Sequence, residues 1–302
     1  MDLKSKIFLI YGPTASGKSE FAIKLAKKIK GEIINADSMQ VYKDLKILTA
    51  RPLKKNFQSI KHHLYGFQNS NISFSTGNWL KLAIKKINQI KKRKKIPILV
   101  GGTGLYFKAL TEGLVEIPTV PLQFRNRIRK LQKKIGQDKF YKKLLKIDPL
   151  VENQINPKDI QRSVRAYEVK LFTKKSITEW YKSTRSNFKT NDFYKIIINY
   201  PRISLIKKIN LRTNQMLEIG AISEVKKFLR FKISKDKSIS KAIGITEIGD
   251  YLKNLTDKEE VIRKISIKTR QYAKRQMTWA RGHMTTWKKI SPFRLNNFLK
   301  KI

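Results

Sequence analysis

The sequence has 302 residues, and its 67 Lys and Arg against 22 Asp and Glu give a formal net charge of +45. A hydrophobic content of 40% with 15 Phe, 11 Tyr and 4 Trp supplies a core of about two domains and argues against a disordered chain. The absence of Cys excludes disulfides, thiolate zinc sites, iron–sulfur clusters and a Cys nucleophile, and 3 His argue against a His-based metal site. No apolar run approaches ~18 residues, and the apolar segment 7–10 is too short for a signal-peptide core, so we expect a cytoplasmic protein without a membrane partner.

The surplus of positive charge suggests a polyanionic partner such as nucleic acid, although a lysine-rich composition accounts for part of it without any function. Residues 119–192 carry 19 basic and 7 acidic side chains, so their net charge per residue is close to the average of the whole chain. Residues 261–302 carry 12 basic side chains and no acidic one. The charge is therefore diffuse over most of the chain and concentrated in this last segment.

The first third of the chain alternates short apolar runs with helical patterns, which is typical of βαβ units around a parallel sheet. The expected strands are 6–11, 32–35 and 96–100, and the expected helices are 20–30, 78–92 and 105–110. Pro97 predicts that the third strand begins near an edge of the sheet, because proline cannot donate to a central ladder.

Helical patterns replace strands in the middle of the chain, and a β-type apolar run returns at 194–199. Further helices are expected in 201–231, 241–253 and 258–282. We therefore predict an α/β fold in which residues 1–117 and 193–302 form the sheet core with its C-terminal helices. A helical insertion domain is predicted over 118–192.

A glycine-rich loop matches the pattern G-x-x-x-x-G-K-[ST] between the first predicted strand and the first predicted helix. Its residues are Gly12, Pro13, Thr14, Ala15, Ser16, Gly17, Lys18 and Ser19. Glycines let the backbone curl so that N–H groups converge on phosphate oxygens, and the positive end of the following helix adds to the field. Lys18 supplies a point charge, and the Ser19 hydroxyl is placed to ligate Mg²⁺. The loop predicts a P-loop NTPase-like core that binds a di- or triphosphate, without naming the reaction.

Polar residues follow two further strands, at the sheet edge where ligands of open α/β sheets bind. Asp37 follows the second strand and can serve as a general base, a Mg²⁺ ligand or a helix N-cap. Thr103 follows the third strand in Gly101-Gly102-Thr103-Gly104, and can hold a substrate group, hold a phosphate oxygen or cap the next helix. We expect both residues to face the glycine-rich loop.

One long helix is predicted over 260–281, since this stretch lacks Pro and Gly and ends at Gly282. At about 100° per residue, one side carries a stripe that would pack on a core: Val261, Ile265, Tyr272 and Trp279. The opposite side carries a stripe of cations: Arg263, Arg270, Lys274 and Arg281. Such a row suits a nucleic-acid backbone, and the alternative is an ordinary solvated helix face.

Other residues with reactive or aromatic side chains are predicted to be structural. Glu32 lies at the start of its strand, on the opposite edge of the sheet from the glycine-rich loop. His62 and His63 stand in a polar stretch and are expected to be surface or hydrogen-bonded residues rather than catalytic ones. Trp79 and Phe107 are more typical of a core than of base stacking.

Taken together, these segments resemble the bacterial tRNA dimethylallyltransferase (tRNA isopentenyltransferase) family. The matching segments are 12–19, 37–42, 49–52, 62–64, 100–106, 159–168, 243–244 and 269–279, in the order of the family. This family transfers the dimethylallyl group of dimethylallyl pyrophosphate to N6 of adenosine 37, beside the tRNA anticodon. Its known members have an α/β core broken by a helical insertion, which agrees with the pattern of predicted elements.

The resemblance implies roles for individual residues. Asp37 would be the general base, with Thr103 beside it, and the glycine-rich loop with Lys18, Ser19 and Mg²⁺ would hold the pyrophosphate. The implied tRNA contacts are Asp37, Ser38, Met39, Gln40, Thr103, Arg125, Gln161, Arg162, Ser163, Val164, Arg165, Lys241 and Gly244, and the cationic stripe adds Arg270 and Lys274. The expected partners are dimethylallyl pyrophosphate and the tRNA anticodon stem-loop, bound by a monomer.

Two other functions share part of this pattern. A small-molecule or nucleoside kinase would also need a phosphate loop and a nearby Asp, but it explains neither the cationic stripe nor the segment 161–165. A non-catalytic RNA-binding protein would bind tRNA whether or not Asp37 were present. One phosphate cradle and one carboxylate match the needs of prenyl transfer, in which a pyrophosphate leaves and an amine loses its proton.

Overall fold

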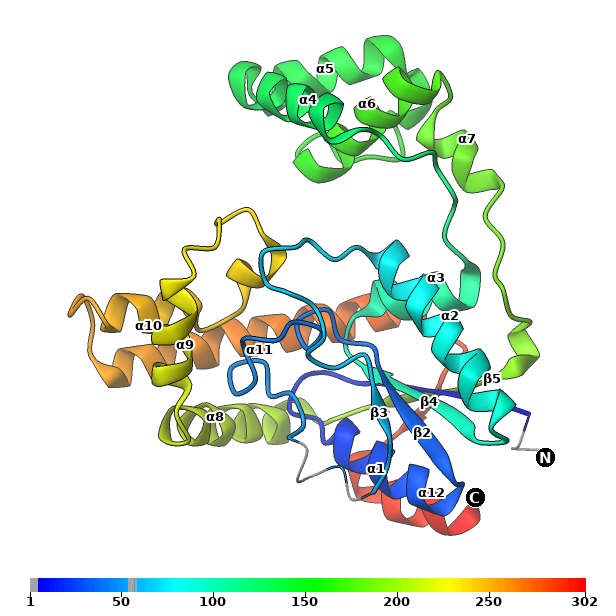
Figure 1. Ribbon diagram of the computed structural model, residues 1–302, viewed down its shortest axis with the longest axis vertical. Helices are drawn as coiled ribbons and strands as arrows, with labels where there is room; N and C mark the ends of the chain where they lie inside the picture. The colour runs from blue at the N-terminus through cyan, green and yellow to red at the C-terminus, as the bar shows by residue number, and fades with distance from the viewer. Residues whose placement is uncertain (1–4, 54–56, 58) are drawn as a thin grey trace. The chain divides into compact units, whose positions relative to one another are not determined.

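The computed structural model describes residues 5–53, 57 and 59–302 (Figure 1). The chain divides into two compact units, one formed by Met1–Thr111 with Phe188–Ile302 and the other by Glu112–Asn187. Both boundaries fall a few residues before those expected from the sequence. Phe188 belongs to the larger unit because its ring packs edge-on against Phe193 in the sheet, with the ring centroids 5.7 Å apart. No described helix combines the length and the hydrophobicity that crossing a lipid bilayer requires.

A six-stranded sheet forms the centre of the larger unit, in the order β3-β2-β4-β1-β5-β6. Its strands are β1 (Ile7–Tyr11), β2 (Gly31–Asn35), β3 (His62–His63), β4 (Ile96–Gly101), β5 (Phe193–Ile198) and β6 (Lys288–Ile290). Every neighbouring pair is parallel, which confirms the predicted α/β fold. The four strands expected from apolar runs are present. No apolar run marks β3 or β6, because both are short and carry polar residues.

Pro97 lies inside the sheet, so the expectation that it marks a strand near a sheet edge is wrong. β4 stands between β2 and β1. Pro97 pairs with Glu32 of β2, while pairing with β1 begins one residue later, between Ile98 and Phe8. The missing N–H of Pro97 therefore falls before the ladder with β1, and the central strand tolerates it.

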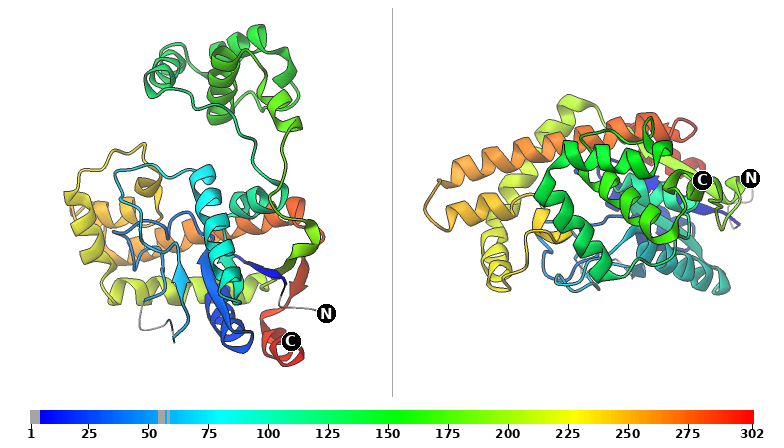
Figure 2. Two further views of the ribbon diagram at one scale, coloured as in Figure 1. Left: turned by 45° about the vertical axis from the view of Figure 1, so that its right-hand side comes forward. Right: turned by 90° about the horizontal axis from the view of Figure 1, so that it is seen from above.

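Helices cover both faces of the sheet (Figures 1 and 2). One face is covered by α1 (Lys18–Lys28) and α12 (Leu295–Lys301), and the other by α2 (Thr76–Lys92), α3 (Gly104–Glu112) and the C-terminal part of α11 (Lys258–His283). A further apolar cluster joins α8 (Arg202–Glu218), α9 (Ala221–Arg230), α10 (Ile245–Tyr251) and the N-terminal part of α11 to the segment after β2. The predicted helix over 260–281 is thus a 26-residue element that contacts both the sheet and this cluster.

The residues predicted to be structural have structural contacts. Trp79 and Phe107 are fully buried against the sheet. The buried Glu32 carboxylate lies 2.7 Å from His63 Nε2 and accepts a hydrogen bond of 2.7 Å from the guanidinium of Arg93. His62 Nδ1 bonds to the Ile60 carbonyl oxygen at 2.8 Å, so neither histidine faces the loop that follows β1.

The smaller unit is helical throughout (Figure 2). Its helices are α4 (Leu122–Ile135), α5 (Gln137–Ile147), α6 (Ile160–Thr173) and α7 (Ile177–Lys182), with a 3₁₀ turn at Pro149–Val151. Its own core includes Phe140 and Tyr167, whose ring centroids are 5.0 Å apart. The segments that enter and leave this unit run close together, since a Cβ on Gly113 would lie 2.2 Å from the Arg185 carbonyl oxygen.

Gly101 generates a testable prediction about stability. It ends β4, and a Cβ there would lie 1.9 Å from the Ala36 carbonyl oxygen, so Gly101→Ala forces two strand ends apart. We expect this variant to lower the free energy of unfolding by about 1–3 kcal/mol, measured by urea denaturation. Gly282→Ala is the matched control because a Cβ at that position meets no atom within 4 Å. Similar losses in both variants would contradict the close approach as the cause.

Candidate active site

The glycine-rich loop joins β1 to α1 and bends tightly between them. Ala15 and Gly17 adopt left-handed φ angles of 62° and 79°, and the Ser16 N–H donates to the Pro13 carbonyl oxygen at 3.3 Å. Gly12 has no room for a side chain, since a Cβ would lie 2.8 Å from Ser16 Oγ. Because α1 begins directly after Gly17, the positive end of its dipole lies at the loop.

Two polar groups in this loop are arranged to meet an anion. The Ser16 hydroxyl is buried and lacks a hydrogen-bond partner among the described residues. Buried hydroxyls seldom stay unpaired, so a phosphate oxygen would satisfy this one. The Lys18 ammonium donates to the Pro13 carbonyl oxygen at 3.2 Å, which holds it inside the bend of the loop.

Two cations and one acid influence one another at the loop, and the cations are in excess. Burial lowers the pKa of Lys18 to about 8, the charge of Asp37 opposes this shift, and Arg212 adds to it. Burial also lowers the pKa of Arg212, again opposed by Asp37. A bound anion would therefore favour the protonated form of Lys18. The protonated form in turn binds the anion more tightly than the neutral form does.

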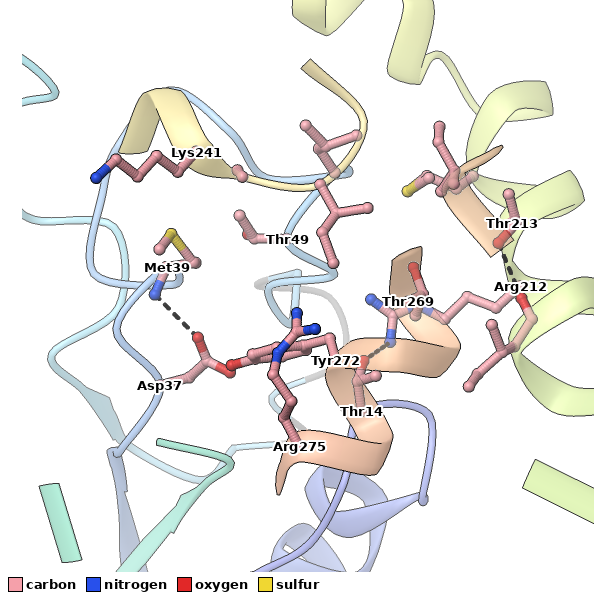
Figure 3. A pocket seen from close by; sticks show the side chains of 16 residues that line it. Thr14, Asp37, Met39, Thr49, Arg212, Thr213, Lys241, Thr269, Tyr272 and Arg275 are labelled. Atoms are coloured by element: carbon pink, nitrogen blue, oxygen red, sulfur yellow. Dashed lines mark hydrogen bonds between the residues drawn. The ribbon is translucent and has the colours of Figure 1, made fainter. Parts of the chain in front are cut away.

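Asp37 is held by the end of β2. Its N–H donates to Asn35 Oδ1 at 2.9 Å, and its own Oδ1 accepts from the Met39 N–H at 2.9 Å. The Asn35 carbonyl accepts from the Trp79 indole at 2.8 Å, so the strand end is anchored on the core. No helix begins here, which removes the N-cap alternative, and Figure 3 shows the carboxylate pointing into a cavity toward Tyr272.

Thr103 ties the ends of β2 and β4 together. Its hydroxyl oxygen accepts from the Ser38 N–H at 2.9 Å and lies 3.3 Å from Ser38 Oγ, while its N–H donates to the Ala36 carbonyl at 3.2 Å. This hydroxyl is thus directed to the Asp37–Ser38 segment rather than to the first turn of α3. The structure brings Thr103 and Asp37 to the same corner of the sheet edge, as expected from the sequence.

Gln276 of α11 links the loop after β1 to the loop after β4. Its side-chain oxygen accepts from the Thr14 N–H at 2.9 Å, and its side-chain nitrogen donates to the Gly102 carbonyl at 2.9 Å. The Tyr11 hydroxyl donates to the Gln276 carbonyl at 2.8 Å. A Cβ on Gly102 would lie 2.1 Å from the Gln276 nitrogen, so the glycine permits this link.

A cavity of about 320 Å³ lies beside these loops (Figure 3). It is lined by Thr14, Asp37, Met39, Leu48, Thr49, Ile209, Arg212, Thr213, Met216, Lys241, Ala242, Ile243, Ile265, Thr269, Tyr272 and Arg275. The phosphate-loop residue Thr14 and the acid Asp37 therefore border one space. The remaining lining is partly cationic and partly apolar, which suits a ligand with an anionic end and a hydrocarbon end.

Several lining residues were not predicted from the sequence. Arg212 of α8 donates to Thr14 Oγ1 at 3.0 Å, yet in the sequence it is one cation among many on an amphipathic helix. Tyr272 was assigned to a core stripe, but it lines the cavity, and burial followed by the charge of Asp37 raises its pKa. Arg275 also lines the cavity, and Gln276 lies next to it on α11. The sequence pointed to these two residues only through the family resemblance of the segment 269–279.

The remaining predicted residues of the larger unit lie in four places. The Gln40 side chain donates to the carbonyl oxygens of Thr49 at 3.0 Å and Ala50 at 3.2 Å. Met39 and Lys241 line the cavity. Gly244, with φ of 105°, packs where a Cβ would lie 2.4 Å from a Leu48 methyl carbon, so its first role here is to admit Leu48. Arg270 and Lys274 line a second groove of about 830 Å³ on the other side of α11, whereas Arg263 of the same stripe pairs with Glu260.

The predicted residues of the smaller unit lie on α4 and α6. Ser163 and Val164 are buried, so within the segment 161–165 only Gln161, Arg162 and Arg165 present side chains to solvent. Arg125 on α4 pairs with Glu168 on α6 at 3.3 Å.

Three comparisons with known proteins agree. The family model described as IPP transferase matches residues 40–283. A tRNA dimethylallyltransferase of Pelagibacter ubique is 61% identical over all of this chain and 96% of the relative, and one of Allorhizobium ampelinum is 42% identical over 94% of each. Among solved structures, a tRNA delta(2)-isopentenylpyrophosphate transferase from Staphylococcus epidermidis matches with 32% identity and a TM-score of 0.69, over 98% of this chain and 96% of that chain. A eukaryotic dimethylallyltransferase acting on tRNA matches with 28% identity and a TM-score of 0.84, over 95% of this chain and 74% of that chain.

The environment of Lys18 predicts how anion binding depends on pH. With a pKa of about 8 in the free protein, Lys18 loses its charge as the pH rises through that value. Binding of inorganic pyrophosphate should then weaken by up to about tenfold per pH unit, measured by calorimetry between pH 7 and 9.5. Lys18→Arg keeps its charge over this range and should show a flatter profile. Equal slopes for the two proteins would remove Lys18 as the titrating group.

Proposed function

Since this chain belongs to the IPP transferase family, we propose that it transfers the dimethylallyl group of dimethylallyl pyrophosphate to N6 of adenosine 37 in tRNA. The observation that carries this proposal is the cavity shared by the phosphate loop and Asp37. Prenyl transfer needs a cradle for a departing pyrophosphate and a base for an incoming amine, and these two groups border one space. We further propose that the enzyme acts as a monomer in the cytoplasm.

The phosphate loop would hold the pyrophosphate and stabilise it as it leaves. When the bond between the allylic carbon and the bridging oxygen breaks, the electron pair stays on the pyrophosphate. Lys18 and Arg212 lie at the loop from two different elements, and the Ser16 hydroxyl offers a further donor. These groups are in place before the charge develops, so little reorganisation opposes the step.

Asp37 would accept the proton that N6 loses as the new carbon–nitrogen bond forms. An exocyclic amine of a purine is a weak nucleophile, and a positioned carboxylate assists it by general base catalysis. The hydrogen bond that the Asp37 N–H donates to Asn35 Oδ1, and the one that Asp37 Oδ1 accepts from the Met39 N–H, set the direction of this carboxylate. Thr103 is hydrogen-bonded to Ser38 and would therefore hold the same segment. It would also contact the target adenine of the tRNA.

Mg²⁺ fits the donors at the loop. Ser19 is the second residue of α1 and offers a hydroxyl beside the phosphate loop. Among the described residues, no group of three or more His, Asp and Glu forms a metal site, so Mg²⁺ would be held chiefly by pyrophosphate and water. When bound, the ion would neutralise part of the pyrophosphate charge.

The five-carbon chain would lie against the apolar part of the cavity. Leu48, Met216, Ile243 and the buried Ile265 of α11 line this part. Excluding water here protects the allylic carbon from hydrolysis during transfer. Glu224 of α9 accepts hydrogen bonds from three successive N–H groups, those of residues 46–48, and so fixes the position of Leu48.

The tRNA would be bound by both units, with the target base turned out of the anticodon loop toward Asp37. We propose contacts from the larger unit at Asp37, Ser38, Met39, Gln40, Thr103, Lys241, Gly244, Arg270 and Lys274, and from the smaller unit at Arg125, Gln161, Arg162 and Arg165. The predicted contacts at Ser163 and Val164 would have to use the backbone, because both side chains are buried.

One assay separates this function from a kinase, the alternative that the phosphate loop also supports. The protein is incubated with unmodified tRNA and labelled dimethylallyl pyrophosphate without ATP, and in parallel with ATP and a panel of nucleosides and small metabolites. Label in tRNA in the absence of ATP supports prenyl transfer. A phosphorylated metabolite with no label in tRNA would overturn it.

Asp37→Asn tests the base directly, since it keeps the shape of the side chain and removes its basicity. We expect turnover to fall roughly 10²–10⁴-fold, while the dissociation constant for tRNA changes little. Turnover is measured with both substrates saturating, and tRNA binding is measured by fluorescence anisotropy. Normal turnover in this variant would show that another group accepts the proton.

The groove that contains Arg270 and Lys274 generates a second prediction. Replacing both residues by Gln should lower the slope of log Kd for tRNA against log salt by about two, because each phosphate contact contributes about one. Arg263→Gln is the control on the same helix, since Arg263 already pairs with Glu260 and should leave the slope nearly unchanged. A slope unchanged by the double substitution would make this helix face ordinary solvated surface.

A further inference from the structure

Three arginines of the smaller unit converge on one buried carboxylate. The side chain of Glu168 on α6 is 1% exposed. Its Oε2 lies 3.3 Å from Arg125 Nε and 3.6 Å from an Arg165 guanidinium nitrogen, and its Oε1 lies 3.8 Å from Arg129 Nε. Of these contacts only that with Arg125 meets the geometry of a hydrogen bond, and Oε1 has no hydrogen-bond partner among the described residues.

The three cations come from two helices and lie around the same carboxylate. Arg125 and Arg129 are one turn apart on α4, and Arg165 lies one turn before Glu168 on α6. Each arginine side chain is 38–47% exposed, although the acid between them is buried. Each arginine therefore lies near the carboxylate while part of its side chain remains in contact with water.

One carboxylate cannot neutralise three guanidinium groups, so this cluster keeps a net charge of +2. Burying a carboxylate without a partner would cost several kcal/mol of folding free energy, so Glu168 favours conformations in which arginines lie beside it. One arginine would be enough to offset this cost. The neighbouring pair shows the simpler case, since Arg162 and Asp159 meet one to one at the surface. The mutual repulsion of the cations is relieved when a further anion binds to them.

We propose that Glu168 is a positioning residue that presents Arg125, Arg129 and Arg165 as one array for RNA backbone phosphates. Each guanidinium carries five N–H donors in a planar fork and uses at most one on Glu168, so paired donors remain for phosphate oxygens. Arrays fixed before binding lose less side-chain entropy when the ligand arrives. This inference rests on the proposed function, because it assigns the array to the tRNA that the enzyme modifies.

Glu168→Gln gives opposite results under the two explanations of this cluster. If only total charge matters, removing an acid strengthens tRNA binding. If Glu168 positions the array, the variant binds tRNA about tenfold more weakly and its salt slope falls by about one to two, despite the gain of positive charge. The dissociation constant is measured by fluorescence anisotropy on the full chain, and the expected kinetic signature of a positioning role in binding is a rise in KM for tRNA that exceeds any change in kcat.

Two matched substitutions control for charge. Glu152→Gln removes an acid at an exposed position of the same unit and should leave binding unchanged or slightly tighter. Arg129→Gln should weaken binding by about three- to tenfold and lower the salt slope by about one, while Lys130→Gln, at the adjacent exposed position, should have a smaller effect. Arg129→Gln leaves Glu168 paired with Arg125 and Arg165, so it tests the array even if Glu168→Gln destabilises the unit.

The outcomes separate this inference from the proposed function. If the unaltered protein does not prenylate tRNA, the proposed function fails. If it does, and a folded Glu168→Gln variant binds tRNA as tightly as the unaltered protein, or Lys130→Gln weakens binding as much as Arg129→Gln, the positioning role of Glu168 is overturned. Thermal unfolding of each variant establishes that it is folded.

Discussion

Parallel pairing of β1, β2 and β4 is the constraint on which the site depends. Tyr11 pairs with Gly101, and Asn35 pairs with Val100, so three strands end at the same level. The residues that follow them are the phosphate loop, Asp37 and the loop of Thr103. Hydrogen bonds from Ala36 N–H to the Val100 carbonyl, 2.8 Å, and from Ser38 N–H to Thr103 Oγ1, 2.9 Å, continue this contact beyond the sheet. A change of register would separate the acid from the loop.

Helices packed on this edge complete the site with cations, whose charge is opposite to that of Asp37. α8 contributes Arg212 and α11 contributes Tyr272 and Arg275, so cations and an acid border one space. Gln276 of α11 joins the phosphate loop to Gly102, and thereby makes the cradle and the base segment parts of one bonded network. Displacement of α11 would therefore disturb both halves of the reaction. This arrangement explains why the helix combines a buried polar residue with an exposed cationic face.

The smaller unit applies the same electrostatic principle to a larger ligand. At the sheet edge, the charge of a single acid, Asp37, acts on the pKa of both Lys18 and Arg212, and the two cations leave net positive charge for a pyrophosphate. In the smaller unit, arginines surround Glu168 and leave net positive charge at the surface. In both places the cations outnumber the one carboxylate near them, so positive charge is left for an anionic ligand. The high net charge of the chain is thus organised at particular points, although much of it remains diffuse.

Local sequence patterns determined the phosphate loop, the four apolar strands and the helical character of residues 122–182, because loop chemistry and hydrophobic periodicity act over a few residues. Asp37 and Thr103 were predictable since parallel strands place their C-terminal ends together. Only the tertiary structure decided that Pro97 stands in a central strand and that Arg212 and Gln276 reach Thr14, contacts that span 198 and 262 residues. Side chains so far apart in the chain meet because of helix packing. The sequence contains 67 Lys and Arg, and nothing in the local sequence shows which of them will bind an anion.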